Sequence, residues 1–307
     1  MPQHLTSIRA AKIISGAEVK GDLPGSQELI FSPRKLTGGD FSFEIGTAGS
    51  TMLVFQTLLP AIISSGRRTT IRMRGGTHVP FSPSYHYVEG VFLPCMREMG
   101  VDVRIAIEAY GFYPKGGGEM RAEILPLRQI HPIRKIERGR IRKIKGCSAV
   151  GNLPISITER QSRAAFEKIR SEIHDIPIFD EMEILSVATP GQGTFIHLQS
   201  EAEHSIAGFT ALGERGKRAE VVGEEAASAF IRYYATGAAF DPYLPDQIAI
   251  YQSMCSEESL YTTSCVTEHL ITNLWVVGHF HEFWYSVKGE IGKPGMVKIR
   301  GGGLMFP

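Results

Sequence analysis

Apolar residues recur at helical spacing from Val88 to Met99, near the middle of the chain. The positions that carry this pattern are Val88, Val91, Phe92, Cys95, Met96 and Met99. Side chains three and four residues apart share one face of a helix, so the pattern predicts an amphipathic helix that Gly100 ends as a C-cap. From Val101 to Ile107 every second residue is apolar, which predicts a strand with one buried face.

Two glycine clusters, Gly75-Gly76 and Gly116-Gly117-Gly118, flank this helix and strand. Each cluster lies where a strand gives way to another element. Glycine permits positive φ and a close approach of backbones, so such clusters serve turns in some proteins and ligand contacts in others. A glycine cluster alone is a weak motif, and both interpretations stay open here.

Several further elements are predicted before the first glycine cluster. They are a helix over 3–14, short strands within 19–33, a strand over 40–45 and a helix over 51–64. The Gly/Ser-rich segment 46–50 opens the last helix, where free N–H groups and the helix dipole would favour an anion. Many helices begin in this way with nothing bound. Gln56 is the one long polar side chain among apolar neighbours, so it is either a satisfied core glutamine or a ligand contact.

A basic segment, Arg128 to Lys145, marks a change in composition. It carries eight Lys or Arg and a single acid, Glu137, between apolar isoleucines. We place a domain boundary here. The segment is either a solvated linker with an edge strand, where lysines discourage edge pairing, or a ribbon that follows RNA phosphates.

Residues 143–235 are predicted to form a compact inserted domain. The pattern gives a strand near 144–150, a helix over 158–173, strands over 182–188, 194–199 and 206–212, and a helix over 219–234. The order strand, helix, three strands, helix is that of an α/β sandwich. The main domain then comprises residues 1–142 and 236–307.

Two candidate sites follow the inserted domain. Asp246 and Gln247 lie at a predicted helix start, where an aspartate is typical of an N-cap. His269 lies in the first turn of another predicted helix, with Thr272 and Asn273 beside it. A helix N-terminus disfavours imidazolium and favours an incoming phosphate, which suits an uncharged nucleophile. A lone histidine at a helix start is also common on surfaces, and the residues alone leave both interpretations open.

Composition and charge narrow the function classes. The 307 residues are enough for a large core and favour two domains. The formal net charge of +1 means that any nucleic-acid site must be local. The four cysteines form no C-x-x-C pair, which argues against a zinc finger and for a cytoplasmic protein.

No apolar run has the length of a membrane span, so no membrane partner is expected. No Walker-type phosphate loop occurs, and the histidines show no metal-site spacing.

Taken together, the central motifs resemble those of the RNA 3'-terminal phosphate cyclase family. GGTHVPFSPS, then the helix and MGVDV, and then GFYPKGGGEM match that family's GGT-x-x-P and G-x-x-P-x-GGG segments in order. HLITN, residues 269–273, extends the resemblance to most of the chain. It implies an α/β (α+β) fold whose main domain repeats a unit of two helices on a four-stranded sheet, as in enolpyruvyl transferases. Residues 143–235 are then the family's smaller inserted domain.

The resemblance also implies a reaction and its residues. An enzyme of this kind uses ATP to convert an RNA 3'-phosphate into a 2',3'-cyclic phosphodiester, with His269 as the nucleophile that carries AMP. The residues matching ATP contacts are Gln56, Pro83, Phe209, Tyr243, Leu244, Pro245, Asp246 and Gln247. Pro83 and Phe209 would sandwich the adenine, and Gln3 and His4 match a pair near the family's active centre, facing RNA. A divalent cation such as Mg²⁺ would neutralise the triphosphate, with ligands that the sequence leaves unassigned, and an oligomer is compatible with the sequence.

The chain departs from the family pattern at its N-terminus, and this departure leaves alternative functions open. Members begin with a strand and a D-G-x-x-G-E-G-G-G-Q segment, whereas Met1 here lies just before Gln3. The glutamate of that segment is a family metal ligand, so we expect either a translation start further upstream or an impaired form. The alternatives are therefore a non-catalytic cyclase-like RNA-binding or ribosome-assembly protein, and a form inactivated by its short N-terminus. His269 argues against the non-catalytic branch, which lacks that nucleophile.

Overall fold

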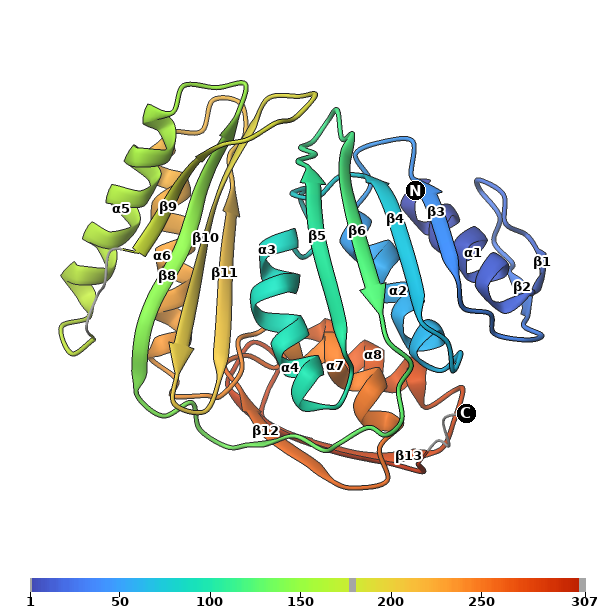
Figure 1. Ribbon diagram of the computed structural model, residues 1–307. Coiled ribbons are helices and arrows are strands. Elements are labelled where there is room, and N and C mark those ends of the chain that lie inside the picture. The colour runs from blue at the N-terminus through green and yellow to red at the C-terminus, as the bar shows by residue number, and fades with distance from the viewer. Residues whose placement is uncertain (1, 177–180, 304–307) are drawn as a thin grey trace.

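The computed structural model describes residues 2–176 and 181–303, which form three four-stranded sheets, one two-stranded ribbon and the helices that cover them (Figure 1). Two of the four-stranded sheets share one large hydrophobic core. The third sheet and its two helices enclose a separate core. The mixed α/β architecture predicted from the sequence is confirmed.

The first four-stranded sheet lies in the N-terminal half. Its strands in spatial order are β3 (Asp40–Glu44), β4 (Thr69–Gly75), β6 (Gly118–Ile124) and β5 (Val103–Ala109). β3 is parallel to β4, and the other pairs are antiparallel. The apolar residues of α2 (Thr51–Ile63) fill the core beside this sheet, because Met52, Phe55 and Leu59 are fully buried.

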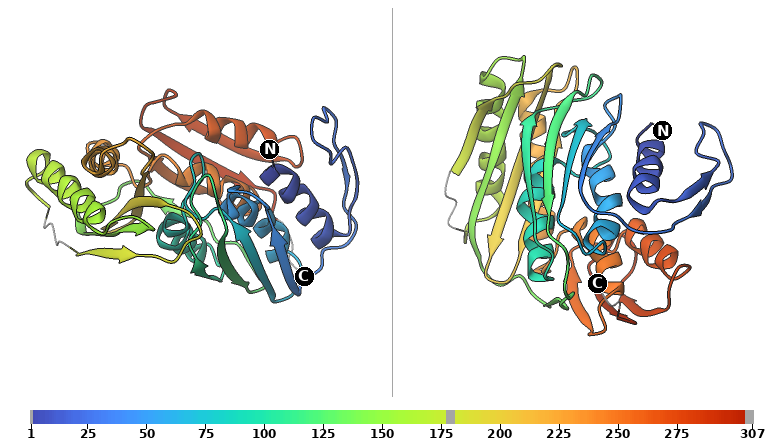
Figure 2. Two further views of the ribbon diagram at one scale, coloured as in Figure 1. Left: turned by 90° about the horizontal axis from the view of Figure 1, so that it is seen from above. Right: turned by 45° about the vertical axis from the view of Figure 1, so that its right-hand side comes forward.

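The first helix and the ribbon lie at the outer edge of this sheet. α1 (Pro2–Ser15) packs on α2, and β1 (Glu18–Lys20) pairs with β2 (Ile30–Ser32) beyond it (Figure 2). These elements agree with the helix over 3–14 and the short strands predicted within 19–33.

The helix predicted over 88–99 begins earlier and is irregular. It consists of α3 (Tyr85–Tyr87), a π-helical turn η1 (Val88–Phe92) and α4 (Leu93–Glu98). It begins at Tyr85 because the Ser84 hydroxyl caps it, accepting a hydrogen bond of 3.2 Å from the Tyr87 N–H. Gly100 follows α4 with a φ of 90°, the left-handed conformation of a C-cap glycine.

The C-terminal segment completes the main domain. Its sheet has the spatial order β13 (Phe283–Lys288), β14 (Gly295–Gly301), β12 (Ser259–Thr263) and β7 (Arg134–Lys135). α7 (Leu244–Ser253) and α8 (Glu268–Val277) pack on each other, and α7 contacts β14. Each four-stranded sheet of the main domain is therefore accompanied by two helical segments.

The inserted segment has the predicted order of elements. Its sheet runs β11 (Ile206–Leu212), β10 (Gly193–Ala202), β8 (Ile141–Gly151) and β9 (Glu181–Ser186), with α5 (Ser156–Glu172) and α6 (Ala219–Tyr234) on one face. Along β10, Ile196 and Leu198 point into the core under the helices. The alternate residues, including Phe195, belong to the face that meets the main domain (Figures 1 and 2). Our proposed boundaries, 143–235, enclose both helices and all of this sheet except the start of β8.

The two domains meet along α3 and η1. Both contact β11, and the Ser84 and Thr210 hydroxyls lie 2.9 Å apart across the junction. Gly90 in η1 faces β10, and a Cβ atom at that position would lie 2.2 Å from Oε1 of Gln199. The contact therefore requires glycine at position 90 unless the Gln199 side chain moves.

Candidate active site around His269

His269 is the second residue of α8 and is exposed to solvent. The helix begins here because the Thr267 hydroxyl accepts a hydrogen bond of 3.1 Å from the Leu270 N–H. Leu270 and Leu274 are fully buried, so they fix the helix against the main core. Thr272 and Asn273 are exposed one turn after His269, as their spacing predicts. His269 therefore lies at an accessible helix N-terminus on a rigid element.

Asp246 lies beside His269 in the first turn of α7. Its Oδ1 atom is buried and has no hydrogen-bond partner within the described residues. Burial raises the pKa of the Asp246 carboxyl to about 6, and the neighbouring His269 acts in the opposite direction. A buried oxygen without a donor is unfavourable unless a ligand or solvent supplies one. Asp246 is thus prepared to accept a hydrogen bond from a bound molecule.

The N-cap interpretation of Asp246 is wrong. α7 begins at Leu244, three residues earlier than that interpretation requires, and Leu244 and Pro245 are buried. The N–H groups of Tyr243 and Leu244 instead donate to Oδ1 of Asp241, at 2.8 and 3.0 Å. The side chains of Leu244 and Pro245 therefore anchor the helix, and of the predicted ligand residues here Tyr243, Asp246 and Gln247 remain accessible.

Gln56 and Gln247 come together although they are far apart in the sequence. Nε2 of Gln56 donates to Oε1 of Gln247 at 2.6 Å, and Nε2 of Gln247 donates to the Tyr243 carbonyl at 2.8 Å. The Tyr243 side chain is 53% exposed, and its ring meets the Tyr87 ring edge-on. Gln56 is thus no isolated core glutamine, since it links α2 to the start of α7.

Asp241 is a structural centre that sequence reasoning missed. Its side chain is fully buried, and it accepts hydrogen bonds from Tyr87 Oη at 2.8 Å and from the Gly208 N–H at 3.2 Å, besides the two N–H groups at the start of α7. Burial raises its pKa to about 6, although the hydrogen bonds oppose that shift. The only sequence signal was an acid directly after the apolar run Ala238-Ala239-Phe240.

Phe209 does not lie where the sequence placed it. The residue is 1% exposed, and its ring packs against Phe230 and Tyr233 in the core of the inserted domain, with centroids 5.8 and 5.5 Å apart. Side chains alternate along β11, so Phe209 points away from the main domain. The prediction that Phe209 stacks on the adenine is therefore wrong. Pro83 is half-buried in the loop that contacts β11. Tyr243, just before α7, is an accessible aromatic ring.

The Gln3 side chain binds the backbone of Ser50, which is the N-cap residue of α2. Its Oε1 atom accepts a hydrogen bond of 2.9 Å from the Ser50 N–H, while the Ser50 hydroxyl accepts one of 3.2 Å from the Leu53 N–H. The N–H groups that the anion-binding interpretation of segment 46–50 relied on are therefore partly satisfied by the protein. His4 is exposed on α1. The RNA contacts suggested for Gln3 and His4 stay predictions.

The glycine clusters serve close backbone contacts. A Cβ atom at Gly76 would lie 2.5 Å from the Ala48 carbonyl oxygen, and one at Gly118 would lie 2.4 Å from the Gly111 nitrogen. These distances exclude a side chain at either position without a backbone shift. Close backbone packing is thus a sufficient reason for glycine at positions 76 and 118, without a ligand contact.

Half of the eight cations of the basic segment 128–145 are paired with neighbouring acids. Four of its cations pair with carboxylates: Lys135 with Glu98, Arg142 with Glu203, Lys143 with Glu181 and Lys145 with Glu201. The Arg138 guanidinium lies over the rings of Tyr233 and Tyr234. This arrangement favours the linker and edge-strand interpretation over a phosphate-tracking ribbon.

The fold and the site define a mixed α/β protein with an accessible candidate nucleophile beside a buried carboxylate and a pair of glutamines. The family model described as RNA 3'-terminal phosphate cyclase matches residues 1–287. The chain belongs to the RNA 3'-terminal phosphate cyclase family.

Curated relatives with the name RNA 3'-terminal phosphate cyclase cover nearly the whole chain. The protein of Methylococcus capsulatus is 38% identical over 309 residues, which cover 97% of this chain and 84% of the relative. That of Staphylothermus marinus is 38% identical over 312 residues, covering 99% and 86%. That of Thermococcus kodakarensis is 40% identical over 298 residues, covering 97% and 85%.

Two kinds of feature are missing from the described part of the chain. None of its helices combines the length and the apolar character needed to cross a bilayer. Within residues 2–176 and 181–303, no group of three or more His, Cys, Asp or Glu side chains is arranged to hold a metal ion.

Proposed function

We propose that this chain catalyses the ATP-dependent conversion of RNA 3'-phosphate ends into 2',3'-cyclic phosphodiesters through a covalent histidine–AMP intermediate. The family membership gives the reaction class. The observation that carries the mechanism is the accessible His269 on the first turn of α8, beside Asp246 with its unpartnered buried oxygen. The N-terminus of a helix favours an anionic phosphate close to this nucleophile.

The reaction divides into three displacements at phosphorus. A ring nitrogen of His269 attacks the α-phosphorus of ATP, forming an N–P bond and releasing pyrophosphate. An oxygen of the RNA 3'-phosphate then attacks that phosphorus, which breaks the N–P bond and gives an RNA–AMP anhydride. Finally the vicinal 2'-OH attacks the 3'-phosphorus, closes the ring and expels AMP. Covalent catalysis of this kind replaces one difficult step with easier ones.

The residues around His269 supply the remaining contacts in this proposal. Asp246 Oδ1 accepts a hydrogen bond from ATP, because none of the residues that the structure describes donates one to it. Tyr243 packs against the base, and the Gln56–Gln247 pair positions the start of α7. A divalent cation such as Mg²⁺ would neutralise charge on the triphosphate. We assign the enzyme to the cytoplasm, on its free cysteines.

The conversion itself can be tested with RNA labelled in its 3'-phosphate. Incubation with the protein and ATP is expected to make the label resistant to alkaline phosphatase, because a cyclic phosphodiester has no terminal monoester. Omitting ATP is the control. Label that stays phosphatase-sensitive, without release of AMP and pyrophosphate, would instead support a non-catalytic RNA-binding protein.

Gln56→Ala should weaken ATP use without removing the nucleophile. The variant loses the hydrogen bond to Gln247, which contributes about 1 kcal/mol, or roughly a fivefold change in affinity. The ATP concentration for half-maximal adenylylation of the protein is expected to rise by about that factor, with a similar final extent. Thr57→Ala, which alters the neighbouring exposed residue on α2, is the matched control. An unchanged ATP dependence in Gln56→Ala would contradict this role.

A further inference from the structure

A large groove lies between the inserted domain and the loop after β5, outside the site around His269. Its volume is about 1160 Å³, and it is bounded by the loop 112–115, the loop 190–193 and the starts of α5 and α6. The stem of Lys115 lies close to Gly191, so the two domains approach each other here. None of the residues expected from the family resemblance to contact ATP or RNA lines this groove.

Cations outnumber acids in the lining of the groove, although the protein has nearly zero net charge. Five cations and one acid, Glu214, line it; the cations are Lys115, Arg160, Arg215, Lys217 and Arg218. A field of one sign in a cleft attracts a polyanion. Lys115 and Arg215 carry the unpaired positive charge of the groove, because the other three cations pair with Glu220 or Glu225.

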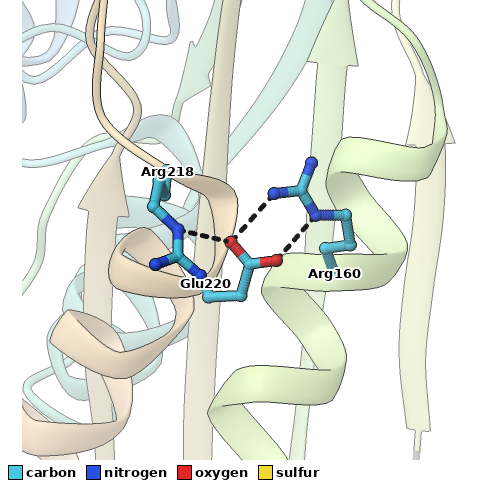
Figure 3. Close-up of polar contacts among 3 residues, drawn as sticks. All are labelled: Arg160, Arg218 and Glu220. Atoms are coloured by element: carbon cyan, nitrogen blue, oxygen red, sulfur yellow. Dashed lines mark hydrogen bonds and ion pairs between the residues drawn. The ribbon is translucent and has the colours of Figure 1, made fainter.

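Two of these cations are held in place by one carboxylate. Glu220 accepts hydrogen bonds from Nε and Nη2 of Arg160, at 2.7 and 2.9 Å, and forms an ion pair with Arg218 at 3.5 Å (Figure 3). The arginines lower the pKa of Glu220 to about 2. The pair of arginines is thus pre-oriented, because the carboxylate joins α5 to the start of α6.

Lys115 and Arg215 have no such partner. Lys217 pairs with Glu225, but neither Lys115 nor Arg215 forms an ion pair or side-chain hydrogen bond within the described residues. Both are exposed, and they lie on opposite domains. These two cations are free to bind an incoming anion.

Exposed aromatic rings accompany the cations. Tyr113 lines the groove and is 67% exposed. Phe81 does not line the groove, but it follows the lining residue Pro80, is fully exposed and has a φ of 59°, which is unfavourable for a bulky residue. Strained backbone of this kind is typically kept where it has a function. Cations together with accessible aromatic rings are the usual surface for single-stranded nucleic acid, because bases stack on the rings.

The groove leads toward the site around His269. A second cavity, of about 650 Å³, shares Pro80, Leu212, Gly213, Glu214 and Lys217 with it, and Tyr243 also lines that cavity. Tyr243 lies three residues before Asp246 and contacts Gln247 through its carbonyl. A strand whose 3' end reached His269 could therefore continue along these cavities.

We propose that this groove binds the single-stranded RNA upstream of its 3'-phosphate, with Lys115 and Arg215 on the backbone phosphates and Tyr113 stacking on a base. The assignment rests on the proposed function for its RNA. A duplex would not offer unstacked bases to the aromatic ring, so the groove selects single-stranded ends.

The test compares variants of the full chain with a fluorescein-labelled single-stranded RNA of about ten nucleotides that carries a 3'-phosphate. In the double variant Lys115→Ala, Arg215→Ala, the slope of log Kd against log salt should fall by about 0.7 for each cation removed. Tyr113→Ala should weaken binding by about tenfold and leave that slope unchanged, because stacking is not electrostatic. Arg142→Ala, an exposed arginine paired with Glu203 outside the groove, is the control and should change neither quantity.

Two further readouts separate the groove from the chemistry. Adenylylation of the protein by ATP alone should be unchanged in the groove variants, and so should cyclisation of a 3'-phosphorylated dinucleotide, which is too short to reach them. The groove assignment is overturned if the double variant binds the long RNA like the wild type, or if it instead needs more ATP for adenylylation. A wild type that binds this RNA through the groove without adenylylation would refute the proposed function alone.

Discussion

His269→Ala is expected to abolish covalent labelling of the protein by ATP that carries its label on the α-phosphate. The expected linkage is a phosphoramidate between the histidine ring and AMP, and no other group can form it if His269 is the nucleophile. RNA cyclisation should fall below detection in the same variant, a loss of at least about a thousandfold. The measurement is retention of label after denaturation, with and without acid treatment.

The chemistry of the linkage gives this experiment its control. A phosphoramidate is lost in acid and stable in base, whereas a serine ester is not acid-labile in this way. His269→Asn should also remain unlabelled, because the amide lacks the ring nucleophile. His279→Ala is the matched variant, since His279 is an exposed histidine just after the same helix, and it should be labelled normally. Label that persists in His269→Ala would place the nucleophile elsewhere.

Asp241→Ala should destabilise the protein by about 3 kcal/mol or more. The substitution leaves the Tyr87 hydroxyl and the N–H groups of Gly208, Tyr243 and Leu244 without their buried acceptor. Denaturant unfolding measures the loss. Tyr87→Phe removes only one of these bonds and should reduce stability by about 1 kcal/mol. Equal stability of Asp241→Ala and the wild type would contradict this account.

The pH dependence of stability offers an independent check on Asp241. Its pKa of about 6 in the folded protein exceeds the ordinary value of 3.8, so the folded state binds the proton more tightly. The stabilisation from that proton is complete below about pH 4 and is lost as the pH rises through 6. Asp241→Asn does not titrate, so the stability of the wild type relative to it should decline between pH 4 and 7.

Periodicity predicted most of the fold because its elements are long and amphipathic. The helix over 219–234 has the predicted bounds, and the inserted sheet has the predicted strands. Along the helix over 219–234 one face is buried, so its apolar pattern reports the local structure directly. Local patterns could not reveal how the sheets are combined, since the pairing of β7 with β12 joins residues more than a hundred positions apart.

The site was predicted less completely, and for a physical reason. Positions that depend on one helix, such as His269 in the first turn of α8, follow from spacing and the family motif. Phe209 was misplaced because the choice between the two faces of β11 depends on which side the helices cover. The buried role of Asp241 was invisible because its partners come from three separate segments. The contact between Gln56 and Gln247 needs the packing of α2 near α7.

The π-helical turn Val88–Phe92 determines how far the inserted domain can be treated as a separate module. Successive residues of an α-helix are about 100° apart, so one additional residue in a turn rotates everything beyond it. The turn lets one helix present Gly90 to the inserted domain while Phe92 and Met96 fill the main core. A chimaera that exchanges only residues 143–235 would pack a foreign sheet against α3 and η1, whose side chains fit the sheet of this protein. The unit of exchange is therefore the inserted domain together with that turn.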